Sequence, residues 1–231
     1  MTKPVALVFG ATSGIGLAIA RSLMSDYEVF GIGRDISKLT LEGVKLISCD
    51  LCDPRSEAKL MEELKSTYKI SCPDLIVFSA GAAYYGLHET LSKENISEMV
   101  ACDLLSPMRI TNHYLSQMKS RKRGQLIYIS SVTADRINPH GASYGACKAG
   151  LRSFALSLFE EVRKYDIKVN LISPDLTSTD LYRNADIAVD EDLVLKPEDV
   201  AAAVDFAVSR SQKVDIFDIV IRPMRNAVIK K

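Results

Sequence analysis

Residues 5–16, VALVFGATSGIG, join five apolar residues to a loop that contains three glycines. A short, continuously apolar run is typical of a β-strand buried on both faces. The glycines let the backbone turn sharply and approach a bound group closely. The amphipathic stretch Ile15–Met24 follows at once and predicts a helix, whose N-terminus attracts negative charge. Strand, loop and helix together therefore predict a site for the pyrophosphate of a dinucleotide.

The same alternation of short apolar runs and longer amphipathic stretches continues along the chain. Strands are predicted at Val5–Phe9, Glu28–Ile32, Lys45–Ser48, Leu75–Phe78, Gln125–Ile129, Lys168–Ile172 and Asp218–Ile221. Most of these runs are continuously apolar, which favours parallel strands covered by helices on both sides. We therefore predict an α/β fold: a single doubly wound Rossmann-type domain over residues 1–231, with a seven-stranded, mainly parallel sheet and helices on both faces. Ligands of such sheets bind beyond the carboxyl ends of the strands.

Composition narrows the classes of function. The 231 residues contain 29 basic and 29 acidic side chains, so no net charge favours nucleic acid or an anionic membrane. No segment approaches the roughly 18 apolar residues of a membrane span, and the N-terminus lacks the features of a signal peptide. Five scattered cysteines favour a reducing, cytoplasmic location. Cys49 and Cys52 form a C-x-x-C without a second Cys or His pair, so we interpret them as free thiols and expect no metal site.

The strongest functional signal is the segment 144–148, Tyr-Gly-Ala-Cys-Lys, which begins thirteen residues after Ser131. On a helix, Tyr144 and Lys148 share one face. A carbonyl that accepts a hydride needs a proton on its oxygen, and a neighbouring Lys cation makes a phenol a better acid. Ser131 would orient and polarise the substrate oxygen. These residue types suit the interconversion of a carbonyl and an alcohol.

The Gly-x3-Gly-x-Gly spacing of residues 10–16, followed in order by Ser131, Tyr144 and Lys148, resembles the short-chain dehydrogenase/reductase family of the Tyr-x3-Lys type. The resemblance covers nearly the whole chain. It implies an oxidoreductase with Tyr144 as general acid and base, and with Lys148 also holding the nicotinamide ribose. The C-terminal segment bears a slighter likeness to NADP-dependent 3-hydroxy acid dehydrogenases.

The resemblance also bears on the cofactor. In the family, the last residue of the second strand decides between NAD and NADP, and that position aligns with Gly33. An acid there would hold the ribose hydroxyls of NAD, whereas an Arg accommodates the 2′-phosphate of NADP. Because Arg34 follows Gly33, we expect NADP(H) rather than NAD(H), although a register that puts Asp35 on the ribose stays open. Asp50 is expected on the adenine, or else as a helix cap before Pro54.

The full set of residues expected at the cofactor follows the ends of successive strands. It comprises Gly10, Thr12, Ser13, Gly14, Ile15, Gly16, Arg34, Asp50, Leu51, Ala80, Gly81, Tyr144, Lys148, Pro174, Thr177 and Thr179. Two departures from the family pattern lie next to these residues, Ser79 for the usual Asn and Asp175 for the usual Gly.

A third departure concerns the catalytic set, which we take as Ser131, Tyr144, Lys148 and Asp103. Asp103 aligns with an Asn whose main-chain carbonyl, in the family, holds a water linked to the Lys. Pro107 has no N–H to bond that carbonyl, so we expect it to be free for such a water. The carboxylate would also favour the charged form of Lys148.

Two other functions fit parts of the same pattern. A catalytically silent NADP(H)-sensing protein of the same fold is the main alternative, and the complete Ser131, Tyr144 and Lys148 set argues against it. A sugar-nucleotide epimerase would need a larger substrate region than Asp180–Lys196, which we expect to be a short lid. The resemblance also implies a small-molecule substrate and a homodimer or homotetramer formed through the two long central helices.

Overall fold

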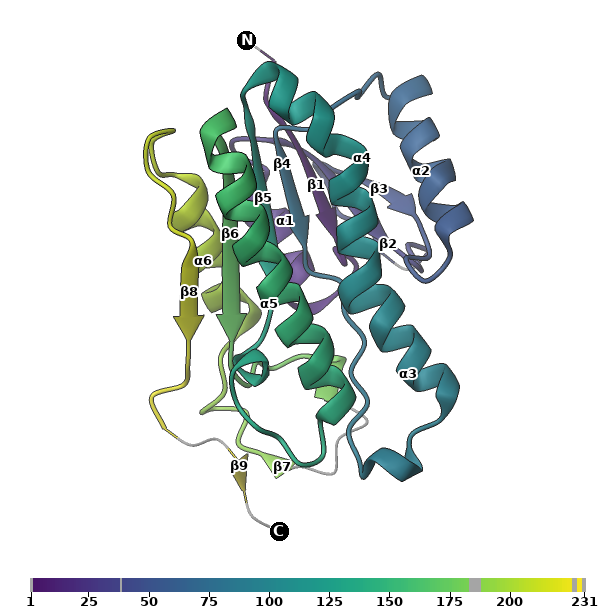
Figure 1. Ribbon diagram of the computed structural model, residues 1–231, viewed down its shortest axis with the longest axis vertical. Coiled ribbons are helices and arrows are strands. Elements are labelled where there is room, and N and C mark those ends of the chain that lie inside the picture. Colours follow the sequence, from purple (N-terminus) through teal and green to yellow (C-terminus); the bar gives the residue numbers. More distant parts are fainter. Residues whose placement is uncertain (1, 38, 183–187, 226–227, 230–231) are drawn as a thin grey trace.

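The computed structural model describes residues 2–37, 39–182, 188–225 and 228–229. Within these residues the central sheet has seven strands in the order β3-β2-β1-β4-β5-β6-β8, and every neighbouring pair is parallel (Figure 1). The strands are β1 (Val5–Phe9), β2 (Glu28–Gly33), β3 (Val44–Ser48), β4 (Leu75–Phe78), β5 (Gly124–Ile129), β6 (Ile167–Pro174) and β8 (Asp218–Ile221). The predicted doubly wound fold is confirmed, and the pairing within the sheet is wholly rather than mainly parallel.

Helices cover both faces of the sheet. In Figure 1, α4 (Ser106–Arg121) and α5 (Ala142–Val162) lie in front of the strands, while α1 (Gly14–Leu23) and α6 (Pro197–Val208) lie behind them. The front layer also includes α2 (Pro54–Ser66), which contributes Leu60, Met61 and Leu64 to the same core cluster as α4 and α5. Successive residues of β1 enter opposite cores, and this two-sided burial explains the continuous apolar runs.

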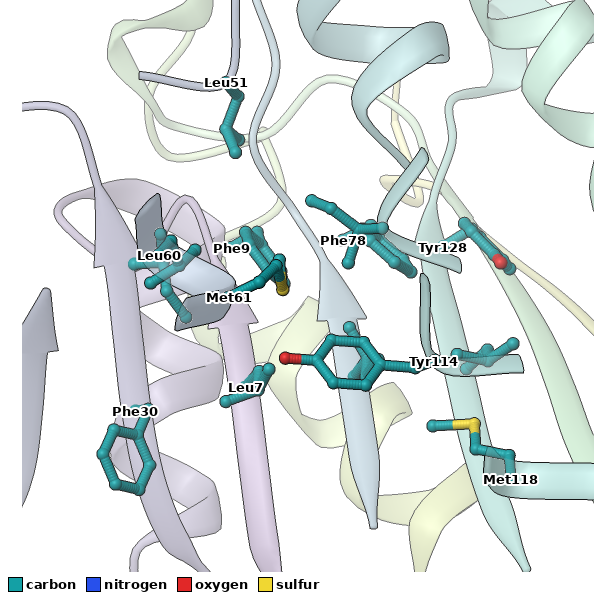
Figure 2. Close-up of a cluster of buried hydrophobic side chains, with 14 of the residues drawn as sticks. Leu7, Phe9, Phe30, Leu51, Leu60, Met61, Phe78, Tyr114, Met118 and Tyr128 are labelled. Carbon is teal, nitrogen blue, oxygen red and sulfur yellow. The ribbon is translucent and has the colours of Figure 1, made fainter. Parts of the chain in front are cut away.

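An aromatic stack crosses the front core and joins the three central strands. The rings of Phe9 and Phe78 are stacked with centroids 5.5 Å apart, and those of Phe78 and Tyr128 with centroids 4.9 Å apart (Figure 2). The buried Tyr128 hydroxyl lies 2.7 Å from the Thr111 hydroxyl of α4, so its polar atom is paired. The stack braces β1, β4 and β5 beside the ends from which the site loops leave.

The chain between β4 and β5 contains an irregular helical turn. After α3 (Lys93–Val100) the helix widens to π geometry over Ala101–Leu105 and then continues as α4. Pro107 lies in the first turn of α4 and has no N–H to offer the Asp103 carbonyl. Such π turns occur often at functional sites. Short 3₁₀ helices lie at His88–Thr90, Val132–Ala134, Arg163–Tyr165 and Asp180–Tyr182.

The predicted lid, residues 180–196, is described only in part, since 183–187 lie outside the described residues. β7 (Ala188–Val189) pairs antiparallel with β9 (Val228–Ile229), a small sheet that the sequence did not predict. The end of the segment is bonded to the loop after β6: the Leu195 amide donates to the Leu176 carbonyl at 2.9 Å. None of the described helices has the length and apolar character that a bilayer crossing requires.

Candidate active site

A cleft opens at the carboxyl ends of β1, β2, β4, β5 and β6. Every residue that the sequence predicted at the cofactor lines it: Gly10, Thr12, Ser13, Gly14, Ile15, Gly16, Arg34, Asp50, Leu51, Ala80, Gly81, Tyr144, Lys148, Pro174, Thr177 and Thr179. Ser131 lines it as well, whereas Asp103 lies beneath the lining and is buried. The structure thus brings the predicted residues together, while their roles stay predictions.

The glycine loop is shaped by close contact between backbones. Gly10 has a φ of +84°, and a Cβ at this position would stand 2.5 Å from the Ala80 amide nitrogen. Gly14 has a φ of +49° and begins α1. Only glycine accepts the first position without moving the neighbouring strand. Ser13, the N-cap of α1, makes no side-chain capping bond, and the first turn of α1 carries no acidic residue. The positive end of this helix therefore faces the cleft uncompensated by its own cap.

The end of the cleft beside β2 carries an ion pair that the sequence did not predict. The Arg34 guanidinium lies 3.1 Å from one Glu98 carboxylate oxygen, and the Tyr84 hydroxyl donates to the other at 2.6 Å. The Arg34 side chain remains 66% exposed, so most of its N–H groups face solvent. Asp35 also lines the cleft, and one of its carboxylate oxygens accepts bonds from the Ser37 amide and hydroxyl.

The structure separates the two interpretations of Asp50. The N-cap of α2 is Asp53, whose carboxylate accepts from the Arg55 amide at 2.9 Å. Asp50 lines the cleft, and its carboxylate accepts from the Cys52 amide at 2.9 Å. The helix-cap function therefore belongs to Asp53, three residues further on.

Ser131, Tyr144 and Lys148 meet at the floor of the cleft, and all three are buried. Ser131 follows β5 and caps a 3₁₀ turn, since its hydroxyl accepts from the Thr133 amide at 3.2 Å. Tyr144 stands in the first turn of α5, and Lys148 follows one turn later on the same face. The Lys148 Nζ lies 5.6 Å from the centre of the Tyr144 ring and donates to the Ile129 carbonyl at 3.1 Å. The helix thus presents a phenol and a cation side by side.

Asp103 contacts Lys148 directly. Its Oδ1 lies 2.9 Å from the Lys148 Nζ, and its Oδ2 accepts from the Ala82 amide at 2.9 Å. Complete burial raises the pKa of the Asp103 carboxyl above its ordinary value, against the opposing pull of Lys148 and the Ala82 amide. From the sequence we expect the Asp103 main-chain carbonyl to hold a water and the carboxylate to favour the charged form of Lys148. The contact observed here is the carboxylate contact, and the water on the carbonyl stays a prediction.

The loop after β6 is held by the unusual Asp175. Its carboxylate accepts from the Leu176 amide at 2.9 Å and pairs with Arg136 at 3.3 Å. The Asp175 carbonyl in turn accepts from the Thr177 hydroxyl at 2.9 Å. Asp175 therefore supplies a turn of its own where the family usually has a glycine, and Thr177 and Thr179 still line the cleft.

Other side chains lie near the site. Glu98 and Cys102 line the cleft and escaped prediction, because nothing in their sequence spacing marked them. Cys52 also lines the cleft, and its C-x-x-C spacing had marked it only as a free thiol. Tyr85 packs against Tyr144 with ring centroids 5.6 Å apart. His140, four residues before Tyr144, is exposed and bonds through its main chain. Among the described residues, no group of three or more His, Cys, Asp or Glu side chains is arranged to hold a metal ion.

Known proteins share this architecture. The family model described as short chain dehydrogenase matches residues 4–192. Carbonyl reductase family member 4 of Xenopus tropicalis is 31% identical over 219 residues, which cover 89% of this chain and 91% of that protein. The crystal structure of a metagenomic short-chain oxidoreductase in complex with NADP is 26% identical, with a TM-score of 0.82 over 97% of this chain and 99% of that one. A 4-hydroxyisoleucine dehydrogenase complexed with NADH and succinate shares the fold, with a TM-score of 0.84 at 22% identity over 95% and 98% of the two chains.

Proposed function

The chain belongs to the short-chain dehydrogenase family and is an oxidoreductase of that family, and on this premise we propose that it transfers a hydride between NADP(H) and a small-molecule carbonyl or secondary alcohol. The observation that carries the proposal is the grouping of Ser131, Tyr144 and Lys148 at the floor of a cleft whose other end is a glycine loop. An accidental Tyr-x3-Lys helix face would have no reason to be buried in such a cleft.

The cleft residues fit a dinucleotide. The loop turns at Gly10 and Gly14, which both have positive φ, and the uncapped start of α1 offers main-chain N–H groups to the charge of a pyrophosphate. When bound, the dinucleotide supplies or accepts the hydride through its nicotinamide ring. Lys148 has one N–H donor beyond those directed at Ile129 and Asp103, and we assign it to the nicotinamide ribose.

The proton moves through Tyr144. In reduction its hydroxyl donates a proton to the carbonyl oxygen of the substrate, and in oxidation the phenolate removes the alcohol proton. The neighbouring Lys148 cation stabilises the phenolate. Ser131 orients the substrate oxygen by a hydrogen bond. Since all three side chains are buried, the proton passes between Tyr144 and substrate with little competition from bulk water.

We prefer NADP(H) to NAD(H) because the Arg34 cation follows the end of β2, while no acid stands at Gly33, the position that decides the cofactor in the family. Asp35 has one carboxylate oxygen bonded to the Ser37 amide and hydroxyl, and a Cβ at Gly33 would strike the Thr12 side chain. The exposed N–H groups of Arg34 can bind the 2′-phosphate while one remains near Glu98. The relatives leave this choice open, because one solved structure holds NADP and another NADH.

A test of the function compares NADPH and NADH oxidation by the purified protein over a panel of ketones, quinones and 3-oxo acids, with Tyr144→Phe as the background control. We expect turnover of at least one panel member with NADPH, and slower turnover with NADH. A protein that binds NADPH but oxidises it with no panel member would instead support the catalytically silent NADP(H) sensor.

We make three further proposals, on the extent of the domain, the oligomeric state and the cellular location. We take residues 1–231 as one dinucleotide-binding and catalytic domain, with 180–196 as its substrate lid. A homodimer or homotetramer is supported by large apolar side chains that stay exposed beside and on the long central helices, Leu105 at 42% and Leu156 at 42%. Light scattering coupled to gel filtration would measure the assembly. The scattered free thiols favour a cytoplasmic location.

A further inference from the structure

Two thiols that the proposed reaction does not use meet in the wall of the cleft. Cys52 lies in the loop between β3 and α2, and Cys102 lies in the π turn between α3 and α4. Both line the cleft, and each thiol is the first influence on the pKa of the other, as expected of side chains near each other. Segments far apart in the sequence thus place two thiols near each other in the wall of the cleft.

A further contact fixes one thiol to the helix that leads to the other. The Cys52 Sγ lies 3.9 Å from the main-chain oxygen of Glu98, which is in α3, one turn before Cys102. Cys52 and Cys102 are each only partly buried, so small solutes that enter the cleft can reach them. The pair is therefore both pre-positioned and accessible.

The two sulfur atoms differ in acidity. The hydrogen bond from Cys102 lowers the pKa of the Cys52 thiol, and the nearby Arg34 acts in the same direction. The same bond and burial raise the pKa of the Cys102 thiol. A thiolate is the attacking species in thiol–disulfide exchange, so Cys52 is the group suited to react first.

We propose that Cys52 and Cys102 form a redox modification site, which a small-molecule disulfide entering the cleft of the cofactor-free protein converts to an intramolecular disulfide and which a bound dinucleotide covers. The Cys52 thiolate attacks one sulfur of the small disulfide, forms a mixed disulfide and releases one small thiol. After losing its proton to solvent, the Cys102 sulfur attacks Cys52, forms the Cys52–Cys102 bond and releases the second small thiol. The two protein thiols are oxidised, and the small disulfide takes up the two electrons.

The cross-link has a consequence for the neighbouring residue. Both cysteines are free thiols, so bond formation must draw the two sulfur atoms together to the covalent distance of about 2.05 Å. Cys102 immediately precedes Asp103, which contacts Lys148 and the Ala82 amide. Movement of the π turn would disturb that contact, so oxidation should lower turnover reversibly. This part of the inference rests on the proposed function, whereas the covalent chemistry does not.

The other cysteines are poorer candidates. Cys49 is buried, and its sulfur contacts the Ser56 hydroxyl at 3.6 Å. Burial raises the pKa of the Cys147 thiol to about 11, so it stays protonated near neutrality. Cys72 precedes β4 and therefore lies at the amino ends of the strands, whereas the cleft lies at their carboxyl ends. Cys72 makes a suitable control because its thiol is also only partly buried.

The experiment treats the purified protein with oxidised glutathione, blocks remaining thiols with iodoacetamide and maps unreduced peptides by mass spectrometry. We expect a Cys52–Cys102 peptide pair, a parallel loss of turnover that dithiothreitol reverses, and slower cross-linking in proportion to the fraction of protein with NADP⁺ bound. Cys72→Ser should behave as the parent protein does. Cys102→Ser, or Cys102→Ala if the first variant folds poorly, should stop at Cys52 carrying glutathione.

Two results would overturn the inference. One is a Cys49–Cys52 pair in place of the expected one. The other is cross-linking that proceeds at the same rate when bound NADP⁺ saturates the protein. A protein that forms the expected pair yet reduces no carbonyl would leave the modification site standing and count against the proposed function alone, because the cross-link is measured by mass.

Discussion

The Nζ of Lys148 lies 2.9 Å from the Oδ1 of Asp103, and the two side chains are only 6% and 0% exposed. In a buried ion pair, the attraction between the two charges offsets the free energy of removing each from water. Removal of one partner therefore leaves an unpaired buried charge that destabilises the folded protein. Gly81 completes the arrangement, since a Cβ at that position would stand 2.9 Å from the same Asp103 oxygen. The Asp103 carboxylate thus fixes the position of Lys148, the cation that we propose acts on Tyr144 and the cofactor. The carboxylate fits there because Gly81 has no side chain.

Tyr144→Phe tests the proton donor. The phenyl ring preserves the packing against Tyr85 but has no hydroxyl, so kcat should fall by about 10²–10⁴-fold. Binding of NADPH should change little, because the hydroxyl acts mainly in the transition state. Steady-state kinetics and fluorescence titration of NADPH measure the two effects separately. A variant that kept most of its turnover would remove Tyr144 from the mechanism.

Arg34→Gln tests the choice of cofactor. If Arg34 binds the 2′-phosphate, losing this charge-assisted contact should raise the Kd of NADPH by about 10- to 100-fold. The Kd of NADH should stay nearly constant, since that cofactor has no phosphate there. Arg163→Gln is a matched control, because Arg163 is also an exposed Arg in a single ion pair, with Glu160. Equal affinity of the parent protein for both cofactors would contradict the assignment.

The sequence predicted those features that depend on local pattern. The strands were found because most of them are short apolar runs, and the glycine loop because the spacing of Gly10, Gly14 and Gly16 has a local backbone reason. The features that the sequence did not predict depend on the relative orientation of elements that are far apart in the chain. The π turn at Ala101–Leu105 sets the direction of Cys102 and Asp103, and Pro107 was its one visible sign. Glu98 meets Arg34 across the cleft, where no spacing rule applies.

Gly81→Ala tests whether the space below Lys148 matters. The added methyl group would press on Asp103, so we expect a loss of stability of about 1–3 kcal/mol, as for other overpacked sites, together with lower kcat. Gly145→Ala is the control: its Cβ would make only an ordinary 3.4 Å contact with the Thr133 carbonyl, and an Ala in a helix gains about 0.5–1 kcal/mol over Gly. Chemical denaturation of both variants measures the difference. If Gly81→Ala were as stable as the parent protein, the Asp103 side chain would be able to move away from the added methyl group without loss of stability.

Asp103→Asn and Pro107→Ala separate the side chain of Asp103 from its main chain. The Asn oxygen can still accept from Lys148, so most turnover should remain, although the Ala82 amide loses its acceptor and stability falls by about 1–3 kcal/mol. The Pro107→Ala variant gains a main-chain N–H that can take the Asp103 carbonyl in a helical bond, so its kcat should fall if that carbonyl serves the proton path. Steady-state kinetics at one pH compares the two variants. The reverse order of activities would mean that the carboxylate alone supports Lys148.

The pH dependence of stability gives Asp103 a test that needs no substrate. Burial raises the pKa of its carboxyl in the folded protein above the ordinary value of about 3.9. Between those two values the folded state holds more protons than the unfolded chain, so the free energy of unfolding falls as pH rises through that window. Asn cannot titrate. The stability advantage of the parent protein over Asp103→Asn should therefore be largest on the acid side of the window and shrink as pH rises. Urea denaturation of both proteins at successive pH values measures this difference, and a difference that grew with pH would mean that Lys148 lowers the pKa of the carboxyl more than burial raises it.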